Sequence, residues 1–189
     1  MITATVQLER AQELLGELTG AAERAMARAL NRAATAGRQA AVKAIGERYA
    51  VRAGDVRERI TLSTATPDRL EVAVVAKSGP LPLTYFPHSP SEPGTGGPGR
   101  PVLRAEILRG QEKDIRGAFV ATIGGKPRVM IRTGGKTRTG KDAMKVVPSV
   151  PIAVMLGAPS VREVVEQRAV AVLDERLEHE LDRELGRAP

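Results

Sequence analysis

The sequence predicts an α+β fold, in which a long N-terminal helix packs on a small antiparallel β-sheet of two hairpins, with extended loops and a C-terminal helix. Three observations predict this fold. Residues 20–49 contain no proline and carry apolar and small residues at helical spacing. Residues 60–78 and 117–135 alternate apolar and polar side chains around turn sequences. Residues 160–187 carry a second helical stripe, which charged residues flank.

We expect the 189 residues to form a single domain of four parts. An N-terminal arm or short helix covers residues 1–19, and a core of helix and sheet covers residues 20–133. A basic loop and proline-rich arm follow at 134–159, before the terminal helix at 160–187. The core holds an insertion at 87–101 with five prolines and four glycines, so we expect this insertion to be mobile or ordered by a partner.

The helix predicted at 20–49 presents two faces. One face is a stripe of small and apolar side chains that favours close approach of another helix, because alanine buries little surface. This stripe packs either within its own domain or also at a subunit interface of a homo-oligomer. The other face is a row of arginines spaced by four residues. The stripe comprises Met26, Leu30, Ala33, Gly37, Ala41 and Ile45, and the row comprises Arg24, Arg28 and Arg32.

The segments on either side of that helix have weaker patterns. At residues 1–6 the pattern predicts a short strand or arm, and at 7–18 a short amphipathic helix that breaks near Thr19. Gly54 is expected to stop the main helix, and Asp55 to cap one or two helical turns that follow. The long helix is therefore expected to lie between shorter helical pieces.

Two hairpins supply the expected sheet. The first turns at Pro67 and Asp68, and the second turns at residues 124–127. Together they provide about four strands, which are enough to cover one face of the long helix. Between the hairpins, prolines interrupt the extended segment PLPLTYF at 80–86, which favours an edge strand or a docking arm.

The terminal helix is expected to begin near Ser160, which has the spacing of a capping box with Glu163. Acidic residues lie outside its apolar stripe, so this outer face is either solvated or a docking surface for a basic neighbour. The stripe comprises Val161, Val165, Ala169, Val172, Leu177, Leu181 and Leu185, and the acidic residues are Glu163, Glu166, Asp174, Glu175, Glu178, Glu180, Asp182 and Glu184.

Charge is unevenly distributed along the chain. The formal net charge is +7, and residues 98–146 carry twelve Lys and Arg against four Asp and Glu. Residues 161–189 reverse this balance, with eight acids against five bases. Such a split indicates either a surface that faces nucleic acid or complementary patches through which copies of one chain bind each other.

Composition and motifs argue against several functions. Without cysteine the chain has no disulfide and no thiolate metal site, and no run of 18 apolar residues is present to cross a membrane. GGKTRTGK is not a phosphate-binding loop, because Met130 stands where the first glycine belongs. His88 and His179 lack companions at metal-ligand spacing, and we expect both to be solvated. We therefore expect no enzyme activity, cofactor or metal.

The basic stretch at 134–146 keeps nucleic-acid binding open. Lys136, Arg138 and Lys141 could neutralise phosphates without reading bases, and such binding would weaken steeply with salt. No zinc finger, aromatic platform or helix-turn-helix accompanies them. Non-specific DNA binding is therefore the alternative to a structural role.

Two short segments carry a family resemblance. PLPLTYF at 80–86 and PSVPIAVML at 148–156, together with the order of elements over residues 20–185, resemble the minor tail protein Z family of lambda-like bacteriophages and prophages. Two features depart from the family pattern, since Val147 replaces a glycine and residues 136–145 are more basic.

The resemblance implies a structural virion protein of a long-tailed bacteriophage or prophage. It implies a tail-completion or neck component that forms a ring around the DNA channel at the head-tail junction. A hexameric ring would match the usual symmetry of long tails, with the tail terminator and the head-completion protein as neighbours and assembly in the host cytoplasm. The family pattern also favours an extended conformation at 102–110.

In such a ring, charged residues are expected to lie at the interface or in the DNA channel. The small-residue stripe of the main helix would pack between subunits. The basic middle of one chain would meet the acidic terminal helix of the next, at Glu178 and Asp182. The expected interface or channel charges are Arg24, Arg28, Arg32, Lys136, Arg138 and Lys141.

Overall fold

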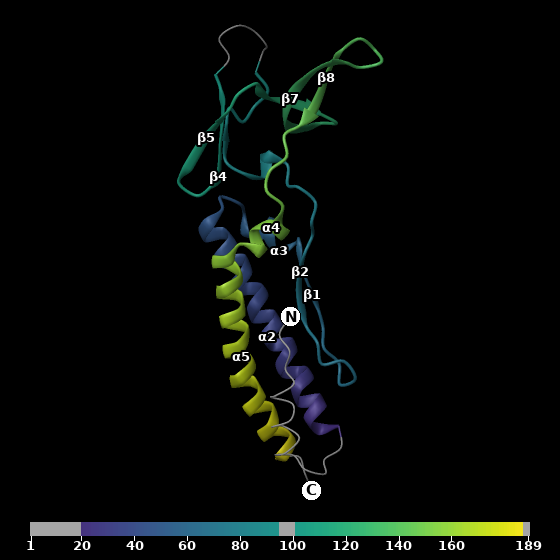
Figure 1. Ribbon diagram of the computed structural model, residues 1–189, viewed down its shortest axis with the longest axis vertical. Coiled ribbons are helices and arrows are strands. Elements are labelled where there is room, and N and C mark those ends of the chain that lie inside the picture. Colours follow the sequence, from purple (N-terminus) through teal and green to yellow (C-terminus); the bar gives the residue numbers. More distant parts are fainter. Residues whose placement is uncertain (1–19, 95–100, 187–189) are drawn as a thin grey trace.

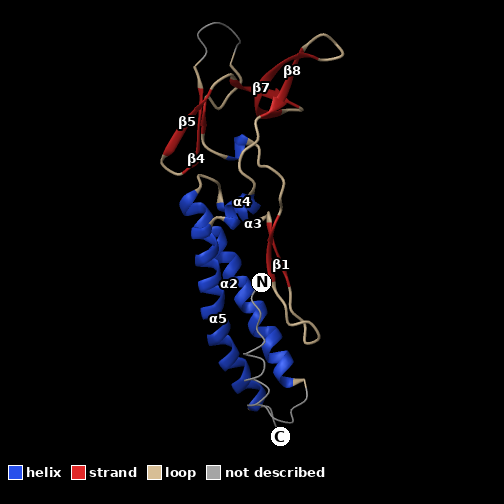
Figure 2. Cartoon of the chain, in the orientation of Figure 1, coloured by secondary structure: helices blue, strands red, loops and turns tan. Residues whose placement is uncertain are grey.

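The computed structural model of the protein describes residues 20–94 and 101–186. The molecule is elongated, with two long helices side by side in one half and two small sheets in the other (Figure 1). A short hairpin runs along the helix pair (Figure 2). The predicted α+β class is confirmed. The arm predicted at 1–19 and the centre of the predicted insertion, residues 95–100, lie outside the described residues.

The two predicted long helices are confirmed. Helix α2 spans Ala21–Arg48 and helix α5 spans Pro159–Leu185. They are antiparallel, because Arg28 near the start of α2 contacts Glu184 near the end of α5, whereas Arg48 contacts Ser160. Alanine at the seam lets the two backbones approach closely.

A first apolar cluster fills this seam. Met26 and Leu30 of α2 and Leu173 of α5 are almost fully buried there. The apolar stripe predicted for the terminal helix is confirmed from Val161 to Leu181, all of it buried, and the side chain of Leu185 lies outside the described residues. Burial of this kind stabilises the pair by about 25 cal/mol for each Å² of apolar surface removed from water.

The end of α2 is held by a residue from the sheet half. Helix α2 stops at Arg48, and Arg109 donates from its Nε and Nη2 to the carbonyl of Gly46, at 3.0 and 2.7 Å. The backbone N–H of Arg109 also donates to the carbonyl of Arg48. These bonds satisfy carbonyls that a helix end leaves unpaired.

The predictions for the helix end at Gly54 and Asp55 and for the capping box at Ser160 were wrong. Gly54 does not stop the main helix but lies inside the short helix α3 (Ala53–Arg57), whose N-cap residue is Arg52, and Asp55 makes no cap bond there. Helix α5 has no side-chain cap either, because the hydroxyl of Ser160 accepts a hydrogen bond from Arg48 at 2.8 Å. A tertiary contact has taken the place of the predicted capping box.

Three small antiparallel sheets replace the single four-stranded sheet that the sequence predicted. Both predicted hairpins are confirmed, but they lie in different sheets, and only the first runs beside α2. The first sheet pairs β1 (Ile60–Ser63) with β2 (Ala73–Ala76). The second contains β3 (His88–Ser89), β4 (Leu103–Leu108) and β5 (Gln111–Ile115), and the third contains β6 (Ala118–Ile123), β7 (Lys126–Lys136) and β8 (Asp142–Val146).

The basic loop predicted from residue 134 is instead the end of a hairpin. Strands β7 and β8 meet at a turn in which Thr137 N–H donates to Lys141 O at 2.7 Å. The extended conformation expected at 102–110 is confirmed as β4. Strands β5 and β8 were not predicted, because they are mostly exposed and polar and lack the alternation that marks a half-buried strand.

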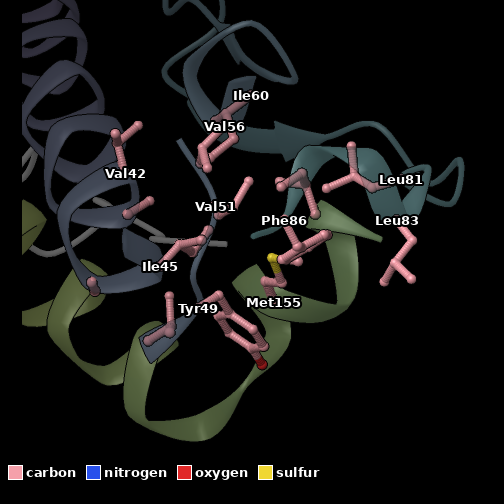
Figure 3. Packing of buried hydrophobic residues seen from close by; sticks show 14 of the residues in the cluster. Val42, Ile45, Tyr49, Val51, Val56, Ile60, Leu81, Leu83, Phe86 and Met155 are labelled. Atoms are coloured by element: carbon pink, nitrogen blue, oxygen red, sulfur yellow. The ribbon is translucent and has the colours of Figure 1, made fainter. Parts of the chain in front are cut away.

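A second apolar cluster joins the helix pair to the sheets (Figure 3). Ile45 of α2, Phe86, and Met155 of α4 (Ile152–Gly157) are almost fully buried in it. These residues come from segments far apart in the sequence. The sheet half is therefore connected to the helices by a packed core and not by loops alone.

The two segments that carry the family resemblance lie against each other in this region. Ser149 N–H donates to Leu81 O at 2.7 Å, and Pro82 pairs with Pro148 in an isolated antiparallel bridge. The edge strand predicted at 80–86 is absent, and Leu83–Tyr85 form a 3₁₀ turn, η1. Proline has no N–H to donate to a strand ladder, which explains the single bridge.

A substitution at Gly37 would test how closely α2 packs against its neighbours. A Cβ at this position would lie 3.6 Å from Ala169 and Val165 and 3.8 Å from Val74, which is ordinary contact. A leucine has further atoms with no space, so we expect Gly37→Leu to lower the free energy of unfolding by about 2 kcal/mol. Chemical denaturation measures this change.

The matched control is Gly37→Ala. It should change stability by less than about 1 kcal/mol, because alanine favours the helix and its methyl group fits. Equal stability of the leucine and alanine variants would contradict the packing described here.

Candidate functional site

The small-residue stripe of α2 lies inside the chain. Its side chains belong to the first or the second apolar cluster and leave almost no exposed surface. Of the two roles that the sequence allows, the structure shows packing within the chain. A subunit contact made by α2 in this fold would have to use its other faces. The buried stripe residues are Met26, Leu30, Ala33, Gly37 and Ala41.

The arginine row is divided between two environments. Arg24 and Arg28 face α5, where Arg28 bridges Glu180 and Glu184 and Arg24 lies 3.5 Å from Glu184. Arg32 is exposed and forms no ion pair among the described residues. Two of the three expected interface charges are therefore already neutralised within the chain.

Glu180 and Glu184 were predicted on the outer face of the terminal helix, either solvated or open to a basic neighbour, and their place on an outer face was wrong. They are only 8 % and 7 % exposed. Residues four apart on one helix lie on the same face, so this pair of acids meets the matching pair of arginines on the antiparallel partner. The sequence gives no register between two helices about 150 positions apart, so the pairing could not be read from local patterns.

This ion cluster shifts the ionisation of its members. The hydrogen bond from Arg28 lowers the pKa of the Glu184 carboxyl, against the opposing effect of burial, and the charge of Arg24 adds to the lowering. For Arg28, burial lowers the pKa, but the hydrogen bonds to Glu180 and Glu184 outweigh it, so that the pKa is raised. Arg28 and Glu184 therefore each favour the charged form of the other.

The other two acidic residues expected at an interface remain available. Glu178 and Asp182 are exposed on α5, and neither joins an ion pair with any residue in the described ranges. Because they are four residues apart, they lie on the same side of the helix. They form the acidic end of the exposed α5 face, which also carries Glu163, Glu166, Asp174 and Glu175.

The basic residues of the β7–β8 hairpin lie at the opposite end of the molecule from the start of α2 (Figure 1). Lys136 contacts Asp142 at 2.6 Å, while Arg138 and Lys141 are exposed and have no ion pair within the part of the chain that the structure describes. The two groups of expected channel or interface charges are therefore not brought together in one chain.

The basic face of the third sheet was not predicted from the sequence. Residues 118–146 contain seven Lys and Arg against one acid, Asp142. The strand register places Arg128 and Arg132 on one face with Phe119, and the Arg132 guanidinium lies 4.7 Å from the centre of the Phe119 ring. Arginine spaced by four within KPRVMIR was the signal, because alternate residues of a strand share a face.

Apolar side chains accompany these cations. Ile123 and Met144 are 41 % and 46 % exposed, and the register puts both on the face that carries Arg128 and Arg132. Arginine, methionine and aromatic residues are enriched where proteins contact each other. We call this surface, Phe119, Ile123, Arg128, Arg132 and Met144, the basic sheet face.

A hollow of about 840 Å³ lies beside His88. His88 is partly buried, not solvated as expected: its Nδ1 lies 2.8 Å from the carbonyl of Phe86, and its Nε2 is buried with no hydrogen-bond partner among the described residues. Asp55 and Ser91 also line the hollow, but no hydrogen bond connects either of them to His88. Nothing there forms the nucleophile and base arrangement of a hydrolase.

The described residues provide no membrane-spanning helix and no metal-binding cluster. None of the helices described is sufficiently long and apolar to span a bilayer. Within the same residues, His, Asp and Glu do not gather in groups of three that could hold a metal ion. His179 is exposed on α5.

The family of prophage minor tail protein Z (GPZ) matches residues 7–188. The chain belongs to this family. Comparisons with curated proteins and with solved structures found no match. As a member of the minor tail protein Z family, the protein is a structural component of a bacteriophage or prophage tail, and it acts with other tail proteins in the virion.

Acid titration tests the ion cluster between the helices of this tail protein. Because the pKa of Glu184 is lowered in the folded chain, its stabilisation is present above the ordinary value of 4.5 and is lost as the pH falls through the folded pKa. We expect Glu184→Gln to lower the free energy of unfolding by about 2 kcal/mol at pH 7. The gap should narrow below about pH 4.5 in denaturation curves.

The control for this titration is Glu178→Gln, on the exposed side of the same helix. Its stability should differ little from that of the parent chain at every pH. A Glu184→Gln gap that stays constant down to acidic pH would contradict the role of this carboxylate.

Proposed function

We propose that this structural tail protein is a tail-completion or neck component that forms a ring at the head-tail junction, around the DNA channel, without catalysis. The observation that carries the proposal is the separation of basic and acidic surface along the molecule. The third sheet, with seven Lys and Arg against Asp142, lies at one end (Figure 1), whereas Glu178 and Asp182, which join no ion pair among the described residues, lie close to the end of α5.

Separated, complementary patches permit a contact that repeats from copy to copy. An antiparallel two-fold contact would use both patches of each copy within a dimer, whereas a head-to-tail contact joins the basic patch of one copy to the acidic patch of the next and leaves one patch at each end for further copies. Such contacts close into a ring when the rotation between copies permits. A hexameric ring fits the symmetry of long tails, with the tail terminator and the head-completion protein above and below.

The composition of the basic sheet face supports a protein contact. Arg128 can form a charge-assisted hydrogen bond with a carboxylate of a neighbouring α5. Arg132 already pairs with Asp142 at 3.5 Å, but this pair is exposed and the remaining N–H groups of the guanidinium can bind a second carboxylate. The exposed side chains of Ile123 and Met144 would be buried beside them, which adds the apolar core that stable interfaces have. Charge sets the orientation and the apolar side chains supply affinity.

Charge reversal on α5 tests the ring. Glu178→Lys and Asp182→Lys, made separately, should each reduce the fraction of assembled protein about tenfold, because a like charge would face the neighbour's arginines. Light scattering measures the oligomer mass. Glu58→Lys is the matched control, since Glu58 is exposed and lies outside both patches. An unchanged mass in both α5 variants would sink the head-to-tail contact.

Non-specific DNA binding is the second candidate function. It is favoured by the exposed, unpaired Arg138 and Lys141 at the tip of the β7–β8 hairpin. At the inner wall of a ring, such a tip would contact the phosphate backbone. Phosphate contacts release counterions, so they weaken as salt rises.

Duplex binding at increasing salt tests this second candidate. Arg138→Glu with Lys141→Glu should lower the affinity for duplex and reduce the salt slope by about 1 for each lost phosphate contact. Lys43→Glu is the control, because Lys43 is 80 % exposed but lies on α2. Equal slopes for the parent chain and the tip variant would rule out DNA contact at the tip.

A further inference from the structure

Strand β2 has an unpaired edge. On the side of β1, Ala73 N–H donates to the Ser63 hydroxyl and Lys77 N–H donates to Arg59 O. Backbone groups alternate in direction along a strand, so the N–H and C=O groups of Val74 and Ala76 point away from β1. No third strand pairs with this edge among the described residues.

A groove runs along that edge. Its volume is about 530 Å³, and it is lined by all five residues from Val72 to Ala76, together with residues of α2, α4 and α5. None of the residues of β1 lines it, so it lies on the open side of β2. Its two charged residues, Arg162 and Glu166, are 3.8 Å apart and neutralise each other.

These features specify the chemistry of the occupant. A free strand edge binds an extended segment through main-chain hydrogen bonds, and the pockets beside it take alternate side chains. Val165, Ala169 and Leu156 make the wall apolar, so the side chains that enter should be apolar and uncharged. Exposed edges without proline or charge are usually covered in native proteins.

We propose that residues 1–6 of the same chain occupy this groove as a third strand beside β2. The segment reads MITATV, with no charged side chain and no proline. Ile2, Ala4 and Val6 fall on one side of a strand, and Thr3 and Thr5 on the other. β-branched residues favour strands. The proposal concerns the fold of one chain and does not depend on the ring.

The length of the connecting chain permits this placement. Gly20 precedes α2, and Ala34, which lines the groove, lies about 21 Å further along the helix. Residues 7–19 would span about 20 Å as a helix and up to about 43 Å when extended. A tethered strand has a high effective concentration at its own groove, which favours it over a strand from another molecule.

Direction and register follow from the same geometry. Strand β2 leads away from the Thr66–Arg69 turn, which packs beside the first half of α2 through Asn31 and Ala65. A strand that leads back to Gly20 therefore runs antiparallel to β2. With Ala4 opposite Val74, the apolar side chains face the helices and Thr3 lies opposite Val75, which is 50 % exposed.

Cysteine pairs test the strand in a chain that has no cysteine of its own. Thr3 and Val75 would form a non-hydrogen-bonded pair with Cα atoms about 4.5 Å apart, which suits a disulfide. We expect Thr3→Cys with Val75→Cys to oxidise within one chain, giving a faster-migrating monomer on a non-reducing gel. Ala4→Cys with Val75→Cys is the matched control, because these side chains would lie on opposite faces.

Two results would overturn the proposal. One is the absence of an intrachain disulfide in Thr3→Cys with Val75→Cys under conditions that oxidise a flexible dithiol. The other is a disulfide only between chains, which mixing the two single-cysteine proteins would reveal and which would assign the groove to a second copy. Light scattering of the same samples reports the ring separately, so failure of one proposal is distinguishable from failure of the other.

Amide hydrogen exchange gives a second readout without cysteine. The amides of Val74 and Ala76 should exchange at least about tenfold more slowly in the full chain than in a variant that lacks residues 1–6. The amide of Lys77, which bonds to Arg59 in β1, is the internal reference. Equal exchange of Val74 and Ala76 in the two proteins would overturn the proposal.

Discussion

The antiparallel packing of α2 against α5 is the constraint on which the rest of the fold depends. With only 2 % aromatic residues the chain has few large side chains for a core, so alanine and glycine at the seam bring two backbones close together. The Arg28 cluster with Glu180 and Glu184 sets the register at one end, and Arg48 with Ser160 does so at the other. The first sheet packs on α2, the second is bonded to the end of α2, and the third joins the helices through the second apolar cluster.

Attachment occurs at a few defined points. Arg109 binds the last carbonyls of α2, and the two segments that carry the family resemblance pair through Leu81 and Ser149 above the buried Met155. The part of the chain that identifies the family is therefore the joint between helices and sheets. This explains why its motifs are apolar and proline-rich and not catalytic: they form a packed connection.

Local patterns predicted elements well and tertiary pairings poorly. The alanine-rich segment without proline predicted the bounds of α2 to within one residue at each end. The turn sequences at Pro67 and at residues 124–127 predicted both hairpins. The separate sheets and the buried Glu180 depend on register between distant segments, which no local period encodes. The exposed polar strand β5 and the hairpin at Lys136 lack hydrophobic alternation, so only their partners reveal them.

The two polar contacts near the ends of the helix pair also have a mechanical consequence. Arg28 and Arg48 each join α2 to α5, near opposite ends of the seam. A force that pulls α2 and α5 in opposite directions along their axes would load both contacts and the alanine seam in shear, so that many contacts must break together and not one after another. The helix pair therefore resists sliding better than it resists separation from one end.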